Sequence, residues 1–264
     1  MTLTHKQATQ ASAVEIERVE RPTVEQFQRE ILPARRPLVI TGVVNEWPAR
    51  RRWTLDFFKS LVGDAEAELR SSDKEAELFF GEFTSKIVKL ADYFDDIKRG
   101  GAPDRSRPYL GNISFNSVPP SPFLEFLRAD FDFPRYFPEQ QQLDQRIWIA
   151  AAGQRSTLHN DNYHNFNAQI SGTKRFILYP PEDYVHLYTE MHNEGCWVSR
   201  VDGFAPDLEQ FPLAAGAKAL SCTLVAGEIL YVPLFWWHQV YAETATVNVN
   251  AWVRLPGGLD FWSQ

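Results

Sequence analysis

The sequence predicts a mainly β fold with flanking helices, a double-stranded β-helix or jelly roll preceded by an N-terminal α/β extension. From Gln145 onward, short β-rich runs follow one another, separated by turn signals such as Ser171-Gly172 and Ala226-Gly227. Many short strands with regular turns are typical of sandwiches, barrels and jelly rolls. We favour the jelly roll because its two facing sheets leave an open mouth for a ligand. Before Gln145, helical spacing alternates with strand-like stretches.

The N-terminal part is predicted to hold four short helices and one buried strand. Thr23 to Gln26 has the pattern of a capping box, Gly63 ends a second helix, and Gly100-Gly101 ends a third. Ser121-Pro122 begins the fourth. The expected helices span Thr23–Ile31, Leu55–Val62, Ile87–Ile97 and Pro122–Arg128, and the expected strand spans Arg36–Val44.

Seven strands are predicted in the second part, and one long segment, Glu182–Gly216, interrupts them. Loops of that length in compact domains are usually functional or mobile. The expected strands are 146–151, 165–170, 175–179, 219–225, 229–232, 237–241 and 246–253. We expect residues 1–12 to be a disordered tail and residues 13–264 to form a single jelly-roll domain, with an N-terminal part over 13–144 and a catalytic core over 145–255.

Composition excludes several classes of protein. The chain has 264 residues, 44% of them hydrophobic and 23% charged, which is typical of a globular domain. No apolar run approaches the length of a membrane span and no signal peptide opens the chain, so neither secretion nor membrane insertion is expected. The net charge of −7 argues against a nucleic-acid partner. The two cysteines favour a reducing cytoplasm, with a disulfide between them left as a minor alternative.

Three residues have the types and spacing of a metal site. His159 and Asp161 stand at i and i+2, so on a strand they share one face, and His238 follows on a later strand. Two histidines and one carboxylate on one face of a metal leave the opposite face open, as in non-haem Fe(II) oxygenases. The alternative is a satisfied core histidine next to a turn aspartate.

Other candidates for chemistry are weaker. His164 has the opposite strand parity from His159, and His186 and His192 lie in the long segment, where we expect them to face solvent. Ser221-Cys222 has no recognisable base partner. The chain has no glycine-rich phosphate loop, which disfavours nucleotide cofactors.

The motifs around this triad resemble the JmjC family of cupin-like, 2-oxoglutarate-dependent oxygenases, in particular the group of the asparaginyl hydroxylase factor inhibiting HIF. The likeness runs over about Arg36 to Val253 and is most specific between Ser156 and Trp252. The motifs that carry it are Ser156–Asp161, Asn165–Pro181, Val201-Asp202 and Gly227–Pro233 with the Trp236-Trp237-His238 that follows.

The resemblance implies Fe(II), 2-oxoglutarate as cosubstrate and O2, with His159, Asp161 and His238 as the iron ligands. Lys174 matches the lysine that binds the far carboxylate of the keto acid. Other cosubstrate contacts implied by the likeness are Tyr109 and Ser156 through their hydroxyls, and Asn165 and Asn250 through their amides. The alternative for Lys174 is an exposed strand lysine. For Tyr109 and the two asparagines the alternatives are aromatic packing and ordinary turn or ladder polar groups.

The expected activity is hydroxylation of an amino-acid side chain in a protein or peptide, with release of succinate and CO2. Arg200, Asp202 and Trp252 are candidate substrate contacts. Where the asparaginyl hydroxylase has an arginine-glutamine pair, this chain has Ser199-Arg200, which puts asparagine as target in doubt. Lysine demethylation and a non-catalytic binding or scaffold role are the alternatives. Little chain follows Trp252, so the helical dimer element of some relatives is not expected, and the oligomeric state stays open.

Overall fold

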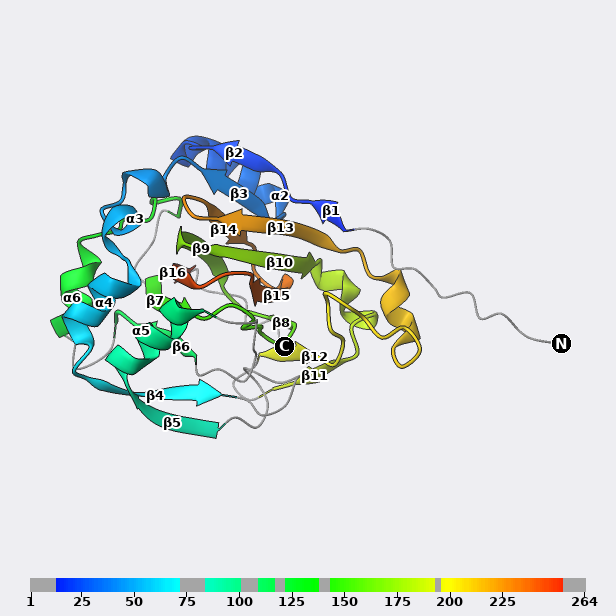
Figure 1. Cartoon of the computed structure of the whole chain (residues 1–264). Coiled ribbons are helices and arrows are strands. Elements are labelled where there is room, and N and C mark those ends of the chain that lie inside the picture. The colour runs from blue at the N-terminus through cyan, green and yellow to red at the C-terminus, as the bar shows by residue number, and fades with distance from the viewer. Residues whose placement is uncertain are drawn as a thin grey trace.

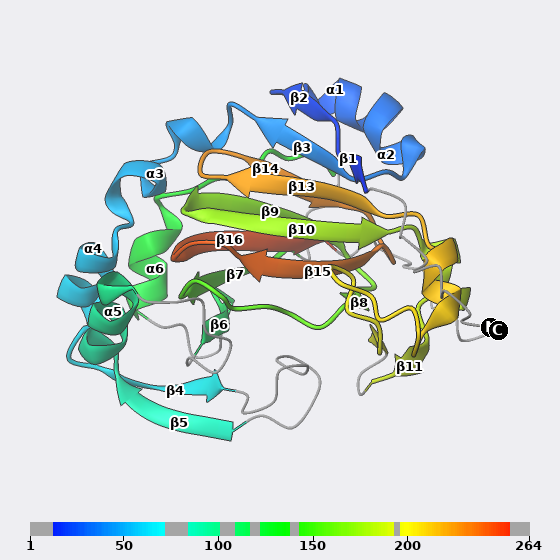
Figure 2. The same cartoon turned by 45° about the vertical axis from the view of Figure 1, so that its right-hand side comes forward.

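The computed structural model describes residues 13–71, 84–100, 109–116, 122–137, 143–192 and 196–253. The expected tail over 1–12 and the last residues from 254 lie outside these ranges, and so do Gly101 and Ser121. Within them, two seven-stranded sheets face each other, and a two-stranded ribbon stands apart (Figures 1 and 2). The ribbon consists of β4 (Glu66–Ser71) and β5 (Thr84–Lys89).

The first sheet contains the strands that carry the two candidate histidine ligands. Its order is β1 (Val14–Glu15), β13 (Leu220–Val225), β10 (Thr173–Tyr179), β15 (Trp237–Ala242), β8 (His159–Asn160), β12 (Trp197–Ser199) and β11 (Thr189–Met191).

The second sheet carries the predicted asparagines and Trp252. Its order is β2 (Arg18–Glu20), β3 (Leu38–Thr41), β14 (Ile229–Val232), β9 (His164–Ser171), β16 (Thr246–Val253), β7 (Leu143–Ala150) and β6 (Leu110–Ser114).

The chain passes repeatedly between the two sheets, as a jelly roll requires. β9 lies in the second sheet and its successor β10 in the first, while β13 and β15 lie in the first sheet and their successors β14 and β16 in the second. All seven predicted strands are present, with ends that differ by three residues or fewer. The mainly β, jelly-roll prediction is therefore confirmed.

Short helices cover the outer face of the second sheet, and Figures 1 and 2 show α3 to α6 gathered at one end of the sheets. They are α1 (Val24–Gln26), η1 (Phe27–Ile31, a π-helical turn), α2 (Leu32–Ala34), α3 (Ala49–Arg52), α4 (Leu55–Val62), α5 (Leu90–Arg99) and α6 (Pro122–Arg128). The 3₁₀ turns are η2 (Val44–Glu46), η4 (Pro181–Val185) and η6 (Pro212–Gly216).

The helix predictions are confirmed with two corrections. The Thr23 hydroxyl accepts a hydrogen bond from the Gln26 amide, as a cap should, but the helical segment continues to Ala34. Ile87 does not belong to α5: it lies in β5 with its side chain 69% exposed, so its helical spacing to Leu90 was accidental. The strand predicted over 36–44 is limited to β3, because the chain turns into η2.

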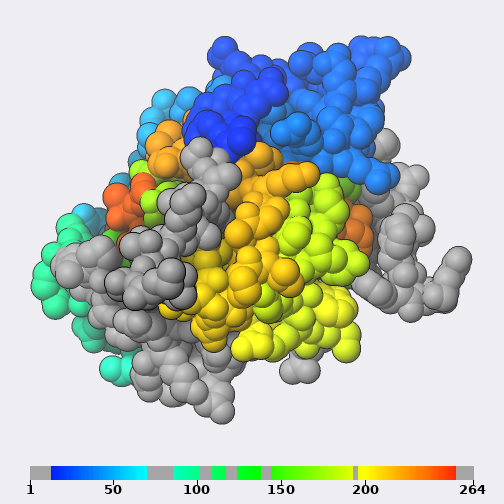
Figure 3. Space-filling model, turned by 90° about the vertical axis from the view of Figure 1, so that its right-hand side faces the viewer, coloured from blue at the N-terminus to red at the C-terminus, as the bar shows by residue number. Residues whose placement is uncertain are grey.

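The long segment 182–216 is not an unstructured loop. It contains β11 and β12, and β12 pairs with β8 so that Val198 stands opposite His159. In Figure 3 the yellow and gold atoms of this segment lie in the middle and lower part of the face, below the blue N-terminal elements. Segment 182–216 therefore contributes two strands, β11 and β12, to the sheet that holds the candidate histidine ligands.

Alternation along β16 separates a packing face from a polar face. Val247, Val249, Ala251 and Val253 are buried in the cluster that joins the second sheet to the helices. The residues between them, Asn248, Asn250 and Trp252, belong to the opposite face because successive side chains of a strand alternate. That opposite face looks toward the first sheet and contributes to the candidate site.

Gly172 makes the tight connection from β9 to β10, and its replacement is expected to be costly. Its φ is +74°, and a Cβ there would lie 2.0 Å from the Ala245 carbonyl oxygen. We predict that Gly172→Ala lowers the free energy of unfolding by about 3 kcal/mol, from left-handed strain plus the clash. Gly100→Ala is the control without a clash: its φ is +71° and its ψ −149°, and no described atom lies within 4 Å of the added Cβ, so a smaller loss, from backbone strain alone, is expected. Equal losses in denaturant titrations would contradict the steric account.

Among the described residues, no helix is long and apolar enough to cross a membrane.

Candidate metal centre

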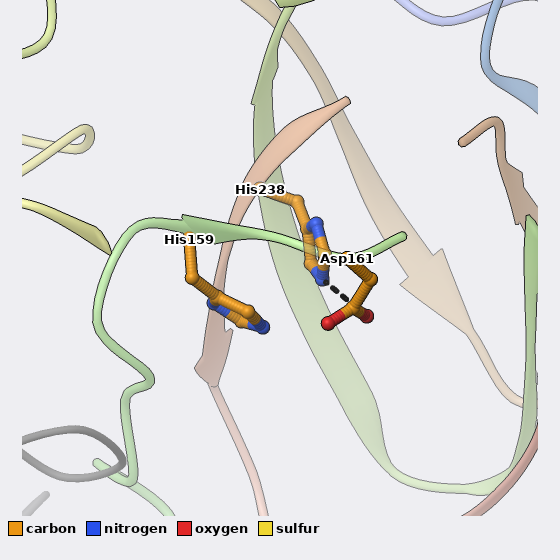
Figure 4. A group of neighbouring side chains, drawn as sticks. All are labelled: His159, Asp161 and His238. Atoms are coloured by element: carbon orange, nitrogen blue, oxygen red, sulfur yellow. Dashed lines mark ion pairs between the residues drawn. The ribbon is translucent and has the colours of Figure 1, made fainter. Parts of the chain in front are cut away.

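The three predicted metal ligands come together at the β8–β15 pair of the first sheet. β8 and β15 are antiparallel neighbours, and His159 and His238 stand directly opposite each other in their register. The two imidazole rings have centroids 4.2 Å apart. Asp161 follows β8 and turns its carboxylate toward both rings (Figure 4). One ligand atom from each residue lies within 4.8 Å of the other two, so one ion could contact all three.

Both histidines are held in the tautomer that a metal needs. Nδ1 of His159 lies 2.8 Å from the Thr157 carbonyl oxygen, and Nδ1 of His238 lies 3.1 Å from the Trp236 carbonyl oxygen. A carbonyl can only accept, so each Nδ1 carries the proton and each Nε2 presents a lone pair. Such backbone contacts orient metal-binding imidazoles in known sites. Burial, together with the neighbouring His238, lowers the pKa of His159 to about 4, which keeps its ring neutral.

Asp161 provides the test of whether a cation fits here. Its Oδ2 is buried and has no hydrogen-bond partner among the described residues. Nε2 of His238 is 3.7 Å away, too far for a hydrogen bond even if it carried a proton. A buried carboxylate oxygen without a partner is costly unless an ion binds it. One carboxylate oxygen and two imidazole nitrogens facing the same space therefore fit a divalent metal ion.

Lys174 lies on β10 with its side chain buried on the inner face, as the cosubstrate prediction requires. Its ammonium group donates a hydrogen bond to Oδ1 of Asn248. Within the described part of the chain, no carboxylate pairs with it. Burial lowers the pKa of Lys174 to about 7, because the charged form loses its hydration. The interior thus holds a cationic group ready for an anion.

We predict that Lys174→Met stabilises the protein in the absence of ligands, in a pH-dependent way. The pKa of this lysine is about 7 in the folded chain and 10.5 in its ordinary state. Below pH 7 both states hold the proton, so folding bears the full desolvation cost. Between about pH 7 and 10.5 only the unfolded chain holds it, so wild-type stability rises with pH. The gain from Lys174→Met, measured by denaturant titration, should be largest at pH 6 and shrink toward pH 10; a constant gain would contradict this.

The two predicted amides contact each other. Nδ2 of Asn250 donates to Oδ1 of Asn165 over 3.2 Å, and Nε1 of Trp148 donates to Oδ1 of Asn250 over 2.6 Å. Tyr109 stacks on Trp148 with ring centroids 5.9 Å apart. Burial raises the pKa of the Tyr109 hydroxyl, so it remains a donor. These contacts place three of the predicted cosubstrate residues in one connected group on the second sheet.

Ser156 lies on the loop before β8, where its hydroxyl oxygen accepts a hydrogen bond from the Val240 amide over 3.0 Å. Because a serine hydroxyl can accept and donate at once, its proton stays available. Its carbonyl oxygen accepts from Nε2 of Gln239. The roles of Ser156, Tyr109, Asn165 and Asn250 toward a cosubstrate stay predictions.

The predicted substrate residues lie in three different surroundings. Arg200 is exposed, 3.6 Å from the Glu190 carboxylate and 5.5 Å from the Phe211 ring centre. Asp202 accepts a hydrogen bond from Nη1 of Arg155, which ties the long segment to the loop before β8. Only Trp252 belongs to the inner face. In the structure Arg200 forms an exposed ion pair with Glu190, and Asp202 forms an ion pair with Arg155 that joins two segments of the fold. The substrate roles of Arg200 and Asp202 remain predictions.

The remaining histidines do not join the triad. His164 is buried against Tyr231, whose hydroxyl lies 2.9 Å from its Nδ1, which agrees with its opposite parity. His186 and His192 are half-buried, so the expectation that they face solvent is wrong. His186 packs against Gly216, because segment 182–216 folds on itself. Neither cysteine forms a disulfide; Cys222 is buried and Cys196 is half-buried.

Sequence reasoning missed three residues on the inner face: Asn248, which binds Lys174; Trp148, which binds Asn250; and Arg146, whose guanidinium lies over Trp252. The sequence contained a signal that could have identified Asn248. Asn248 and Asn250 alternate with Val247 and Val249 in a strand whose apolar face is fully buried. Amides on the other face of such a strand indicate a polar interior.

A jelly roll in which two histidines and one carboxylate face a common space, next to an interior lysine, defines the class of Fe(II)- and 2-oxoglutarate-dependent oxygenases. The family model of the cupin-like domain matches residues 24–255. The chain therefore belongs to the cupin-like family of JmjC oxygenases.

Relatives of known name match over most of this chain. Lysine-specific demethylase 8 of Danio rerio is 27% identical over 248 residues, covering 90% of this chain and 58% of that protein. Human tRNA wybutosine-synthesizing protein 5 is 28% identical, covering 91% of this chain and 78% of its own length. Human bifunctional peptidase and (3S)-lysyl hydroxylase JMJD7 is 28% identical, and the match covers 91% of this chain and 84% of that protein. The finer resemblance to asparaginyl hydroxylases stays a prediction.

Proposed function

We propose that this protein is an Fe(II)- and 2-oxoglutarate-dependent dioxygenase that hydroxylates an amino-acid side chain in a protein or peptide. The observation that carries the proposal is the unpartnered Asp161 oxygen facing two correctly oriented imidazoles. When bound, Fe(II) with O2 supplies the oxidising power that converts 2-oxoglutarate to succinate and CO2 and inserts a hydroxyl group into a C–H bond.

The chain's own residues hold and orient the reactants. His159, Asp161 and His238 would occupy one side of the metal, because all three lie on the β8–β15 pair or directly after β8. The other side is left for the cosubstrate and O2. Fixed Nδ1 contacts to backbone carbonyls prevent either ring from turning away. The protein thus contributes position, while the cofactor contributes the oxidation.

Lys174 would bind the carboxylate of 2-oxoglutarate that lies farthest from the metal. The lysine is buried and has no carboxylate partner of its own within the described ranges, so an incoming carboxylate restores its charge. Asn248 holds the ammonium group in place. Asn165 and Asn250 would orient the metal-proximal end, with Trp148 fixing the amide of Asn250.

A peptide or protein substrate is favoured by the lysyl hydroxylase and the lysine-specific demethylase among the relatives. A tRNA wybutosine-synthesizing protein is also among them, so the expectation of no nucleic-acid substrate stays a prediction. Two cysteines that form no disulfide in the described chain agree with a reducing compartment such as the cytoplasm.

The test is a mass-spectrometric screen of peptide arrays and RNA-depleted lysate with Fe(II), 2-oxoglutarate and air. A peptide that gains one oxygen atom supports hydroxylation, while loss of a methyl group would favour demethylation. Asp161→Asn is the matched inactive control, since it changes the charge and little of the shape. If no peptide changes while a tRNA pool gains oxygen, the proposed substrate class is wrong.

A scaffold protein that keeps the fold without turnover is separated by a second readout. Anaerobic Fe(II) with 2-oxoglutarate should give a visible charge-transfer band, and admission of air should then release succinate slowly even without substrate. A band that persists in air, with no succinate and no oxidised peptide, would contradict an enzymatic role.

A further inference from the structure

Trp252 carries a hydrogen-bond donor that the proposed chemistry leaves unused. Its indole Nε1 is buried, and the described residues offer it no acceptor. An indole nitrogen can only donate, and a buried donor without an acceptor costs free energy. Asp161 also has an unpartnered buried atom, and the metal accounts for that one. The Trp252 donor calls for a ligand of a different kind.

Trp252 lies beside the Asn165–Asn250 pair and near the segment that carries Asp161. It follows Asn250 by two residues on β16 and so shares its inward face, and it stands opposite Asn165 in the register of β9. Its ring is 6.1 Å from that of Tyr163, which follows the metal ligand Asp161 by two residues. Along β16 the indole thus lies on one side of Asn250, and Asn248 with its partner Lys174 lies on the other.

A network of polar contacts on β6 and β7 holds this indole in place. The guanidinium of Arg146 lies 4.7 Å from the Trp252 ring centre. Its Nε and Nη2 donate to Oδ2 of Asp144 over 3.0 and 2.6 Å, and its Nη1 donates to Oδ1 of Asn112 over 2.5 Å. Oδ1 of Asp144 accepts from Ser114. We call Arg146, Asp144, Asn112 and Ser114 the Trp252 clamp.

The clamp also sets the charge that a ligand meets. Arg146 would attract an anion if it were unpaired, but it is engaged with Asp144, so the pair is close to neutral. An ionised ligand would have to enter a partly buried space without a counter-charge, which is unfavourable. A neutral acceptor carries no such cost. Among neutral acceptors, the carbonyl oxygen of a peptide amide is strong and is present at every residue of a peptide.

We propose that Trp252 is a substrate-positioning residue whose indole N–H donates to a backbone carbonyl of the peptide being oxidised. The inference rests on the proposed function and narrows its substrate class to peptides bound through their main chain next to the target residue. The clamp keeps the donor oriented before the peptide arrives, so little order is lost on binding. Trp252 and its clamp thereby fix how far the bound main chain lies from the metal ligands.

The experiment follows the Trp252 indole proton by NMR in protein labelled with ¹⁵N at indole nitrogens and loaded with Zn(II) and 2-oxoglutarate. Trp252→Phe identifies the resonance, and Trp47→Phe, which removes a tryptophan buried between Phe131 and Phe133, is the matched control. The probes, at equal concentrations, are acetyl-trialanine methylamide, acetate and uridine. We expect the peptide to move the Trp252 proton downfield, as a new hydrogen bond does, and to move it more than the other two probes.

Affinity provides the second readout. Loss of one neutral hydrogen bond predicts that Trp252→Phe weakens binding of the capped peptide about three- to tenfold, and Trp47→Phe leaves it unchanged. An indole proton that does not move with the peptide overturns the proposal, and so does a larger response to acetate or uridine. Because this titration needs no turnover, it separates failure of the donor role from failure of the proposed oxygenase activity, which the succinate assay reports.

Discussion

Replacing Asp161 by asparagine is expected to remove metal binding and lower turnover by at least about 100-fold, since even residues that only orient metal ligands cost 10- to 100-fold. The variant should still fold. The carboxylate oxygen that it replaces has no described partner, and the introduced amide can donate to Nε2 of His238, 3.7 Å away in the wild type. The loss is therefore one of chemistry and does not reflect unfolding.

Thermal unfolding separates these two effects. At a free metal concentration about 100 times the Kd, binding stabilises the wild type by about 2.7 kcal/mol, or roughly 5–10 °C in Tm for a chain of this size. Asp161→Asn should unfold near the wild-type temperature without metal and show no metal-dependent rise. Asp132→Asn, which alters an exposed carboxylate, is the control and should keep the full rise. A metal-dependent rise retained in Asp161→Asn would contradict the assignment.

The second large effect is expected at Lys174. A hydrogen bond to a charged group contributes about 1.5–3 kcal/mol, so Lys174→Ala should raise the KM for 2-oxoglutarate about 10- to 100-fold. The pKa of about 7 adds a pH dependence in the wild type. Above pH 7 the ammonium must regain a proton to hold the carboxylate, so the KM should rise with pH, by at most about tenfold per unit.

Steady-state kinetics at several pH values checks both parts. Lys98→Ala is the matched control, because Lys98 pairs with Asp56 on an exposed helix face outside the site. It should leave the KM unchanged. A KM for 2-oxoglutarate that is unaltered in Lys174→Ala, or that is independent of pH between 6 and 9 in the wild type, would contradict the role given to this lysine.

The strands were predictable because each is short, β-branched or aromatic, and bounded by glycine or proline turns. The three residues alone were a weak signal, because six histidines give several accidental combinations; the triad was predictable because the surrounding motifs resemble a known family. Helical spacing misled at Ile87, since four apolar residues match a helical period by chance when a strand runs directly into a helix. Local spacing alone does not reveal where one element stops.

Contacts made across the two sheets could not be read from the chain. Lys174 and Asn248 are 74 residues apart, and their hydrogen bond depends on how β10 faces β16. The same holds for Trp148 with Asn250 and for the position of Arg146 over Trp252. The pairing of β12 with β8 was hidden because a three-residue strand inside a long segment carries almost no periodicity. Register and sheet packing decide these contacts.

The most direct test of the account is a crystal structure of the protein soaked with Mn(II) and 2-oxoglutarate without oxygen. We expect one anomalous peak within about 2.0–2.3 Å of Nε2 of His159, Nε2 of His238 and a carboxylate oxygen of Asp161. Density for the keto acid should run from that peak to the ammonium group of Lys174. A peak elsewhere, or a keto acid that binds away from Lys174, would contradict the central claim.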